Sequence, residues 1–221
     1  MGTTRSTRKP SVHGARRQAE MDFFRYSDVE LDYLQNQDEV LAQAIKRIGL
    51  IERAVIPDLF TALVSSIVHQ QISNKAGATV WGRVSQLLGT VTPETVTAAS
   101  LEAIQSCGMS FRKAGYIMSI GSAVASGELD LAELPSLPDS EVIRCLSGQP
   151  GIGVWTAEML MIFSMQRPDV VSWHDLAIRR GMMNLYGQAE LTRPQFDAYR
   201  QRYSPYGSVA SLYLWQVLKE T

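Results

Sequence analysis

Asp175 is the residue whose type and position most favour chemistry. It lies in residues 172–180, SWHDLAIRR, where a short apolar run ends and a helix is predicted to begin. A carboxylate at the start of a helix accepts backbone N–H groups and is stabilised by the helix dipole, so it should stay ionised. It could then stabilise a positive charge that develops on a neighbouring group. The alternative is that Asp175 is only the N-cap of this helix.

A glycine-rich segment precedes Asp175 and could bind a phosphate group. Residues 148–153, GQPGIG, break the helical periodicity and are followed by an apolar pattern of helical spacing. The N–H groups at the start of a helix are unpaired and can hold a phosphate oxygen, and glycines let a sugar-phosphate backbone come close. The candidate contacts are Gly148, Gly151, Ile152 and Gly153. The alternative is a plain connection between two helices, with Gly148 as the C-cap.

Helices are the elements that must position these residues. The apolar residues between positions 31 and 48 are spaced as one or two amphipathic helices, and residues 111–125 form another helical stripe. Residues 69–72, HQQI, form a polar break between two further apolar helices. Such a break suggests a functional loop, although it could also be a loop that satisfies its own amides. No repeat, coiled-coil heptad or series of strands is apparent, so we predict an all-α protein.

The composition indicates a globular protein. The chain has 221 residues, of which 45% are hydrophobic, enough for one domain or for two small subdomains that share a core. Its apolar runs are too short to cross a membrane, and its basic N-terminus lacks an apolar signal segment. Cys107 and Cys145 have neither disulfide nor metal-ligand spacing, and the three histidines are scattered. We therefore expect no metal, no cofactor and no membrane contact, and a location in the cytoplasm.

The charge distribution argues against a strongly basic surface. The net charge is −1, and five of the 21 basic residues but none of the 22 acidic ones lie in residues 1–19. The rest of the chain carries 16 basic and 22 acidic side chains, a balance of −6. Binding to a nucleic acid would then depend on backbone amides and on a local basic patch. The candidates for this patch are Lys75, Arg83, Arg112, Lys113 and Arg179.

Four segments together resemble the helix-hairpin-helix DNA glycosylase superfamily. Residues 146–163, LSGQPGIGVWTAEMLMIF, look like its helix-hairpin-helix, and residues 173–181, WHDLAIRRG, look like the segment that carries its essential aspartate. Residues 65–73, SSIVHQQIS, and 205–215, PYGSVASLYLW, are further matches. The four segments follow the order found in the superfamily, and the resemblance is greatest to the 3-methyladenine DNA glycosylase II group.

The resemblance implies two helical subdomains with a cleft between them. Subdomain A would comprise about residues 21–58 and 182–221, and subdomain B about residues 59–181, which include the helix-hairpin-helix. Residues 1–20 would be a disordered basic tail outside this glycosylase domain of residues 21–221.

The resemblance also implies roles for residues around the cleft. Asp175 would lie beside the sugar of an extruded nucleotide, and Gln71, next to Gln70, would fill the gap that this nucleotide leaves in the duplex. The base pocket would be built from Trp155, Met159, Trp215, Trp173 and Tyr206. Aromatic faces attract cations, so this pocket would hold a methylated, positively charged purine better than a normal one. Tryptophan and methionine at helical spacing are, however, also typical of a core.

The implied activity is removal of alkylated purines of the 3-methyladenine type from double-stranded DNA, in base excision repair. Such a protein would be associated with the nucleoid, or lie in the nucleus of a eukaryote. We take a monomer as the default. Cleavage of the N-glycosidic bond makes the sugar oxocarbenium-like, and a nearby anion stabilises it. Bifunctional members of the superfamily carry a lysine where this chain has Trp155, so we expect a monofunctional enzyme that leaves an abasic site. Met159 replaces a tyrosine of some relatives, which leaves the range of accepted bases open. The alternatives are a non-catalytic helix-hairpin-helix DNA-binding protein and a glycosylase for oxidised or mispaired bases.

Overall fold

The computed structural model describes residues 22–219, and these residues form a helical protein. The only β pairing within this part of the chain is an isolated antiparallel bridge between Phe23 and Ala54. The prediction of an all-α fold is therefore confirmed. None of the described helices is both long enough and apolar enough to span a membrane. The helices are α1 (Asp28–Gln37), α2 (Glu39–Ile48), α3 (Leu59–His69), α4 (Asn74–Leu88), α5 (Pro93–Ala98), α6 (Leu101–Ser106), α7 (Phe111–Ala125), the 3₁₀ helix η1 (Leu134–Ser136), α8 (Asp139–Ser147), α9 (Val154–Phe163), α10 (Leu176–Tyr186), α11 (Arg193–Tyr203) and α12 (Gly207–Lys219).

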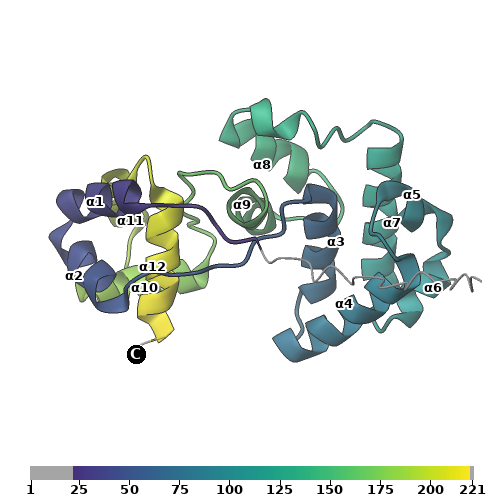
Figure 1. The fold of residues 1–221 in the computed structure, drawn as a ribbon, viewed down its shortest axis with the longest axis horizontal. Helices are drawn as coiled ribbons and strands as arrows, with labels where there is room; N and C mark the ends of the chain where they lie inside the picture. Colours follow the sequence, from purple (N-terminus) through teal and green to yellow (C-terminus); the bar gives the residue numbers. More distant parts are fainter. Residues whose placement is uncertain (1–21, 220–221) are drawn as a thin grey trace, which may run out of the picture.

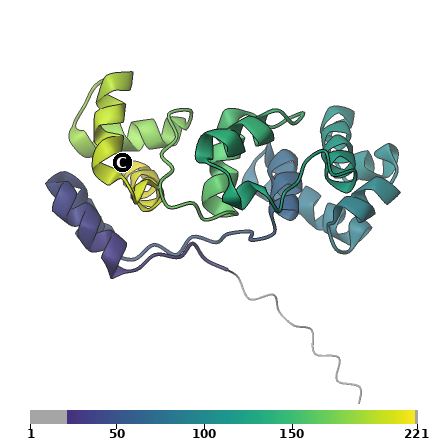
Figure 2. The same ribbon diagram turned by 90° about the horizontal axis from the view of Figure 1, so that it is seen from above.

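The helices form two groups, with α8 and α9 between them (Figure 1). One group contains α1, α2, α10, α11 and α12, and the other contains α3 to α7. Figure 2 shows the same separation from above. The first group thus combines helices from the two ends of the described chain, whereas the second group comes from its middle. The predicted tail of residues 1–20 lies outside the described residues.

The helix α10 belongs to the first group over its whole length. It packs along α12 so closely that a Cβ atom on Gly181 would lie 2.1 Å from the carbonyl oxygen of Leu214. The predicted subdomain boundary between residues 181 and 182 therefore falls inside this helix.

Two extended segments, residues 22–27 and 49–58, run side by side between the two groups (Figure 1). The N–H of Phe24 donates to the carbonyl of Arg53, and the N–H of Val55 donates to the carbonyl of Asp22, both at 2.8 Å. The N–H of Ile56 donates to the carbonyl of Phe163 at the end of α9, also at 2.8 Å. This pairing brings the segment that carries Arg53 against α9.

Asp38 explains why residues 28–48 form two helices. Its N–H donates to the carbonyl of Leu34 and ends α1, while its carboxylate accepts the N–H of Leu41 at 2.9 Å and begins α2. A residue that is extended and offers a side-chain acceptor breaks one amphipathic stripe into two helices. The helix predicted over residues 111–125 is confirmed as α7, with Ser110 as its N-cap.

The helix α9 is the element around which the candidate site is built. Its side chains Ala157, Leu160, Met161 and Ile162 are buried, and its only charged residue is Glu158. Its N-terminus follows the glycine-rich segment directly, and its C-terminus meets the extended segment at Phe163. A mostly apolar helix of this kind is fixed by packing on several sides, which makes it a rigid support for the residues it carries.

Candidate active site

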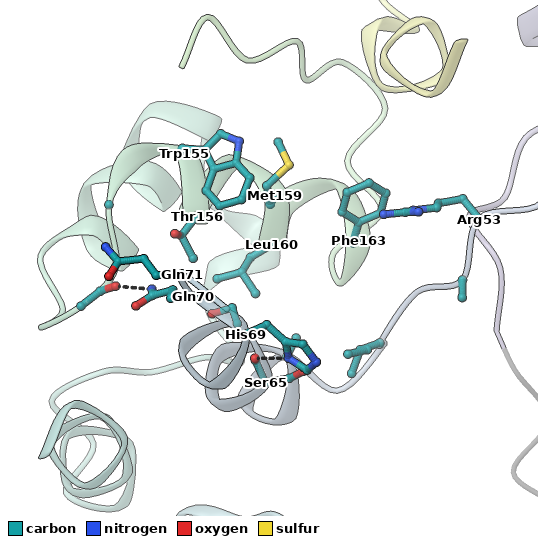
Figure 3. Close-up of a pocket in the computed structure, with 16 residues that line it drawn as sticks. Arg53, Ser65, His69, Gln70, Gln71, Trp155, Thr156, Met159, Leu160 and Phe163 are labelled. Atoms are coloured by element: carbon teal, nitrogen blue, oxygen red, sulfur yellow. Dashed lines mark hydrogen bonds between the residues drawn. The ribbon is translucent and has the colours of Figure 1, made fainter. Parts of the chain in front are cut away.

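A cavity of about 750 Å³ opens between α3 and α9. Figure 3 shows Trp155, Met159 and Phe163 of α9 on one side of it and Ser65 and His69 of α3 on the other. The remaining lining residues come from the extended segment, from both helices and from the two neighbouring loops, and they are Arg53, Ala54, Ile56, Ala62, Ser66, Gln70, Gln71, Gly151, Gly153, Thr156 and Leu160. The aromatic and apolar wall on α9 is suited to a flat ring.

Asp175 lies beside this cavity and is connected to it through Trp155. Its Oδ1 accepts the N–H of Ile178 at 2.9 Å, so Asp175 is the N-cap of α10, as predicted. Its Oδ2 accepts the indole N–H of Trp155, also at 2.9 Å. Asp175 is 6% exposed and is not among the lining residues, whereas Trp155, which lines the cavity, is 45% exposed.

The donors to Asp175 are neutral groups. Within residues 22–219, no arginine, lysine or histidine nitrogen lies within ion-pair distance of its carboxylate. The same residues contain no cluster of three or more histidine, cysteine, aspartate or glutamate side chains that could hold a metal ion. The anion therefore remains available to interact with a positive charge outside the protein.

The glycine-rich segment forms a hairpin, residues 148–153, between α8 and α9. Gly148 is the C-cap of α8, and Gly153 is the N-cap of α9, where no side chain accepts the amides of the first turn. The described residues also offer no hydrogen-bond acceptor to the N–H groups of Gly151 and Gly153. Ile152 differs, because its side chain is buried and its N–H donates to the carbonyl of Gln149. The free amides at the positive end of α9 can bind an anionic oxygen.

Two glycines of the hairpin are needed for different reasons. Gly151 has a φ of +83°, and a Cβ atom there would lie 2.3 Å from Cδ2 of Tyr116. A Cβ atom on Gly153 would have no atom within 4 Å. Gly151 is therefore required by the fold, whereas Gly153 leaves open space on the exposed side of the hairpin.

The HQQI loop, residues 69–72, borders the same cavity. The side-chain N–H of Gln70 donates to the carbonyl of Gly151 at 2.7 Å, which ties the loop to the hairpin (Figure 3). Lys113 donates to the carbonyls of Val68, at 3.0 Å, and of Gln70, at 2.5 Å, and burial lowers the pKa of its amine. Gln71 is exposed and has a φ of +56°, which glutamine adopts rarely. The loop thus holds its backbone rigidly and presents one free polar side chain.

Three of the predicted pocket residues do not line the cavity. Trp215 packs behind Phe163, with ring centroids 5.4 Å apart. Tyr206 packs edge-on against Tyr33, and Trp173 packs edge-on against Phe196 on α11. The structure therefore brings Trp155 and Met159 to the cavity. Of the other three, only Trp215 contacts a lining residue, and Trp173 borders a separate hollow.

Two of the predicted basic contacts, Lys75 and Arg179, differ in exposure. Lys75 is exposed in the first turn of α4, close in sequence to the HQQI loop. Arg179 is half-buried, and its guanidinium lies 5.0 Å from the ring centroid of Trp173. Of these two side chains, only Lys75 is fully exposed.

Three residues near the candidate site were not predicted from the sequence: Phe163 and Arg53, which line the cavity, and Glu158, which borders a separate hollow. Phe163 lies four residues after Met159 and eight after Trp155, so helical periodicity could have identified it. Glu158 could have been recognised as the one charge in an otherwise uncharged helix. Arg53, whose guanidinium lies 4.9 Å from the ring centroid of Phe163, carries no such pattern, because a distant segment brings it there.

One family model and several known proteins are similar to this chain. The family model described as HhH-GPD superfamily base excision DNA repair protein matches residues 64–203. DNA-3-methyladenine glycosylase 1 of Schizosaccharomyces pombe is 32% identical over 165 residues, which cover 72% of either chain. The crystal structure of a DNA-3-methyladenine glycosidase from Bacillus halodurans has a TM-score of 0.81 and 39% identity, and the match covers 90% of this chain and 93% of that one. A 3-methyladenine DNA glycosylase of Schizosaccharomyces pombe in complex with abasic DNA has a TM-score of 0.73 and 29% identity, with 85% and 95% covered.

Proposed function

The chain belongs to the HhH-GPD superfamily of base excision DNA repair proteins, and from this we propose that it is a DNA glycosylase that removes alkylated bases. It binds double-stranded DNA, extrudes the damaged nucleotide and hydrolyses its N-glycosidic bond. The observation within the molecule that carries the proposal is the bond between Asp175, a carboxylate without an ionic partner among the described residues, and Trp155, an aromatic residue of the cavity.

The hairpin is proposed to hold the DNA backbone. The N–H groups of Gly151 and Gly153 donate no hydrogen bond to the described residues, and the dipole of α9 favours an anion at its N-terminus. The open space beyond Gly153 lets a phosphate approach the backbone closely. This mode of binding does not depend on base sequence and agrees with a protein whose net charge is −1.

Gln71 is proposed to occupy the gap that the extruded nucleotide leaves. Its side chain is exposed at the tip of the HQQI loop, and Lys113 and Gln70 hold the loop backbone. A backbone that is already held in place, with one free side chain, suits insertion into a base stack, because the loop loses little conformational entropy on binding. A glutamine there forms hydrogen bonds with the orphaned base in place of apolar contacts.

The cavity is proposed to receive an alkylated purine. Trp155 and Met159 offer a ring face and a thioether to a flat base, whereas the guanidinium of Arg53 lies over the ring of Phe163. Alkylation of a purine ring nitrogen gives the base a positive charge, and a cation is attracted to aromatic faces by about 0.5–2 kcal/mol. A normal purine lacks this charge, so the same wall discriminates between the two.

Asp175 is proposed to act on the sugar and not on the base. An alkylated purine leaves as a neutral molecule, so it needs little protonation. The sugar becomes positively charged as the bond breaks, and a preorganised carboxylate stabilises that charge. The bonds from Ile178 and Trp155 keep the carboxylate in one orientation before the reaction.

We propose that the enzyme is monofunctional. A glycosylase that also cuts the strand needs an amine to form a Schiff base with the sugar. No lysine is among the residues that line the cavity, and Lys113 is bound to two carbonyls. Water is then the nucleophile, and the product is an abasic site.

One experiment tests this function against its alternatives. Duplexes that carry 7-methylguanine, hypoxanthine or 8-oxoguanine at one position are incubated with the protein and then divided, with alkali added to one half. We expect alkali-dependent breaks at the methylated base, and none in a parallel reaction with Asp175→Asn. Breaks before alkali would contradict the monofunctional assignment, and a preference for 8-oxoguanine would assign the enzyme to oxidised bases. Binding without any release would indicate a non-catalytic DNA-binding protein.

We further propose that the enzyme acts as a monomer where the DNA is, in the nucleoid of a bacterium or in the nucleus of a eukaryote. The cavity, the hairpin and Asp175 all come from one chain, so no second copy is needed to complete the site. Light scattering at working concentration, alone and with a short duplex, tests the stoichiometry.

A further inference from the structure

Residues 172–175 form the turn that presents Asp175. The N–H of Asp175 donates to the carbonyl of Ser172 at 3.4 Å, which closes the turn. The side chain of Ser172 is fully buried, whereas His174 in the middle of the turn is exposed. The position of Asp175 therefore depends on what holds Ser172 at the other end of the turn.

Glu158 holds Ser172. The hydroxyl of Ser172 donates to Oε2 of Glu158 at 2.5 Å. Glu158 is half-buried on the side of α9 that faces away from the cavity, where it borders a smaller hollow of about 180 Å³. A hydrogen bond to an ionised acceptor is about twice as strong as one between neutral groups, so this bond fixes the start of the turn firmly.

The helix α9 thus contacts the turn at both ends. Trp155 donates to Asp175 at the end of the turn, and Glu158, three residues further along the helix, accepts from Ser172 at its start. Residues three apart on a helix lie on neighbouring parts of its surface. Trp173, inside the turn, is held separately by the guanidinium groups of Arg179 and Arg193, which lie 5.0 and 5.3 Å from its ring centroid.

We infer that Glu158, through the hydroxyl of Ser172, is a positioning residue for Asp175, an inference that rests on the proposed function. The helix α9, which begins at the proposed DNA-binding hairpin, then also positions the carboxylate of Asp175. The distance between the bound DNA phosphate and the carboxylate that acts on the sugar is therefore set by one helix. Displacement of a reacting group by about 1 Å can lower a rate about 100-fold, which gives such a contact a measurable effect.

The ionisation of Glu158 supplies a readout that packing alone does not. Burial raises the pKa of its carboxyl, and proximity to Asp175 raises it further, while the bond from Ser172 and the nearby His174 and Arg193 lower it. The other charged groups that border the hollow are already paired, Asp139 with Arg167 and Asp169 with Arg200. As the pH falls through this raised pKa, Glu158 is protonated and its bond to Ser172 weakens. Activity should therefore decline on the acidic side, beginning above the ordinary pKa of a glutamate.

The test measures single-turnover release of 7-methylguanine by the full chain and its variants at pH 7.5. Glu158→Ala and Ser172→Ala should each lower the rate constant about 10- to 100-fold. The double variant should be no slower than the slower single variant, because both remove the same contact. Glu158→Gln keeps an acceptor oxygen for Ser172 but not its charge, so its rate should lie between those of Glu158→Ala and the wild type. Affinity for an abasic duplex should change less than about twofold in all of them.

The pH dependence of the same rate constant separates positioning from stability. In Glu158→Gln the acidic decline should move to lower pH, because the titrating carboxyl is gone. Glu141→Gln is the matched control, since Glu141 is a partly exposed glutamate of α8 that pairs with Arg144, and it should leave both rate and pH profile unchanged. A merely structural role would lower the melting temperature without moving the profile.

The inference is overturned if Glu158→Ala and Ser172→Ala remain within about twofold of the wild type. If either alanine variant fails to fold, Glu158→Gln decides, and an acidic decline that does not move in that variant rejects the inference. Failure of the wild type to release 7-methylguanine would instead count against the proposed function. Release by the wild type with unaffected variants would count against Glu158 alone.

Discussion

The indole nitrogen of Trp155 donates a hydrogen bond of 2.9 Å to Oδ2 of Asp175. The indole is 45% exposed and lines the cavity, whereas the aspartate is 6% exposed and lies beside it. One side chain therefore offers a surface for a base and, at the same time, orients the carboxylate that would act on the attached sugar. In the proposed function, this relationship would connect recognition of the base with cleavage of its bond to the sugar.

Replacement of Trp155 by phenylalanine should separate these two roles. Phenylalanine keeps an aromatic face but cannot donate to Asp175. A hydrogen bond to a charged group contributes about 1.5–3 kcal/mol, so we expect single-turnover release to slow about tenfold or more. Affinity for a duplex with a methylated base should change little. Loss of affinity with an unchanged single-turnover rate constant would show that the indole acts only as a binding surface.

Asp175→Asn should abolish base release while the protein remains folded and binds DNA. Asparagine is as good an N-cap as aspartate, so its amide oxygen can still accept the N–H of Ile178. It carries no charge to stabilise the sugar cation, and we expect the rate to fall by at least about 100-fold. Melting temperature and affinity for an abasic duplex serve as the controls. Near-normal turnover would remove Asp175 from the mechanism.

The alanine variants of Gly151 and Gly153 form a matched pair. At Gly151 the positive φ and the contact with Tyr116 should make alanine destabilising, by roughly 1–3 kcal/mol, as thermal unfolding can measure. At Gly153 the fold has room for a Cβ atom, so stability should be unchanged. Bulkier side chains at Gly153 should weaken binding to damaged and undamaged duplexes alike, because the phosphate contact carries no sequence information. Weakened binding to damaged DNA only would contradict this role.

Gln71→Ala should slow extrusion of the base more than the chemical step. Without the side chain, nothing replaces the extruded nucleotide in the stack, and unstacking costs a few kcal/mol. We expect release from a correctly paired lesion to slow about tenfold. Release from a lesion opposite a mismatch should slow less, because that base is already poorly paired. The same loss on both duplexes would place Gln71 in another role.

Asp38→Ala should destabilise the protein more than Asp58→Ala. Both aspartates are N-caps, but Asp58 is exposed and accepts only the N–H of Thr61. Asp38 is buried and also accepts from Tyr186 at 2.8 Å and from Arg202 at 3.1 Å. We expect losses of about 2–4 kcal/mol for Asp38 and about 1 kcal/mol for Asp58 in the free energy of unfolding. Urea unfolding measures both, and equal losses would contradict the role of the Tyr186 contact.

The sequence alone predicted the local features of the site. The spacing of apolar residues indicated the helices, and the chemistry of caps placed the start of α10 at Asp175. These features depend on neighbours in the chain, so they can be read from it directly. The order of four motifs indicated the family, and residues 64–203 match its model.

The tertiary structure alone decided which side chains meet. Trp155 and Met159 line the cavity while Trp215 packs behind Phe163, although all of them are large and apolar in the sequence. Helical periodicity gives the face of a residue but not the element that covers it. The sequence therefore determined the hairpin, the capping aspartate and the helices, because these follow from contacts within a few residues. Packing between distant segments decided the walls of the cavity and the bonds that hold Asp175, because only the folded chain brings those segments together.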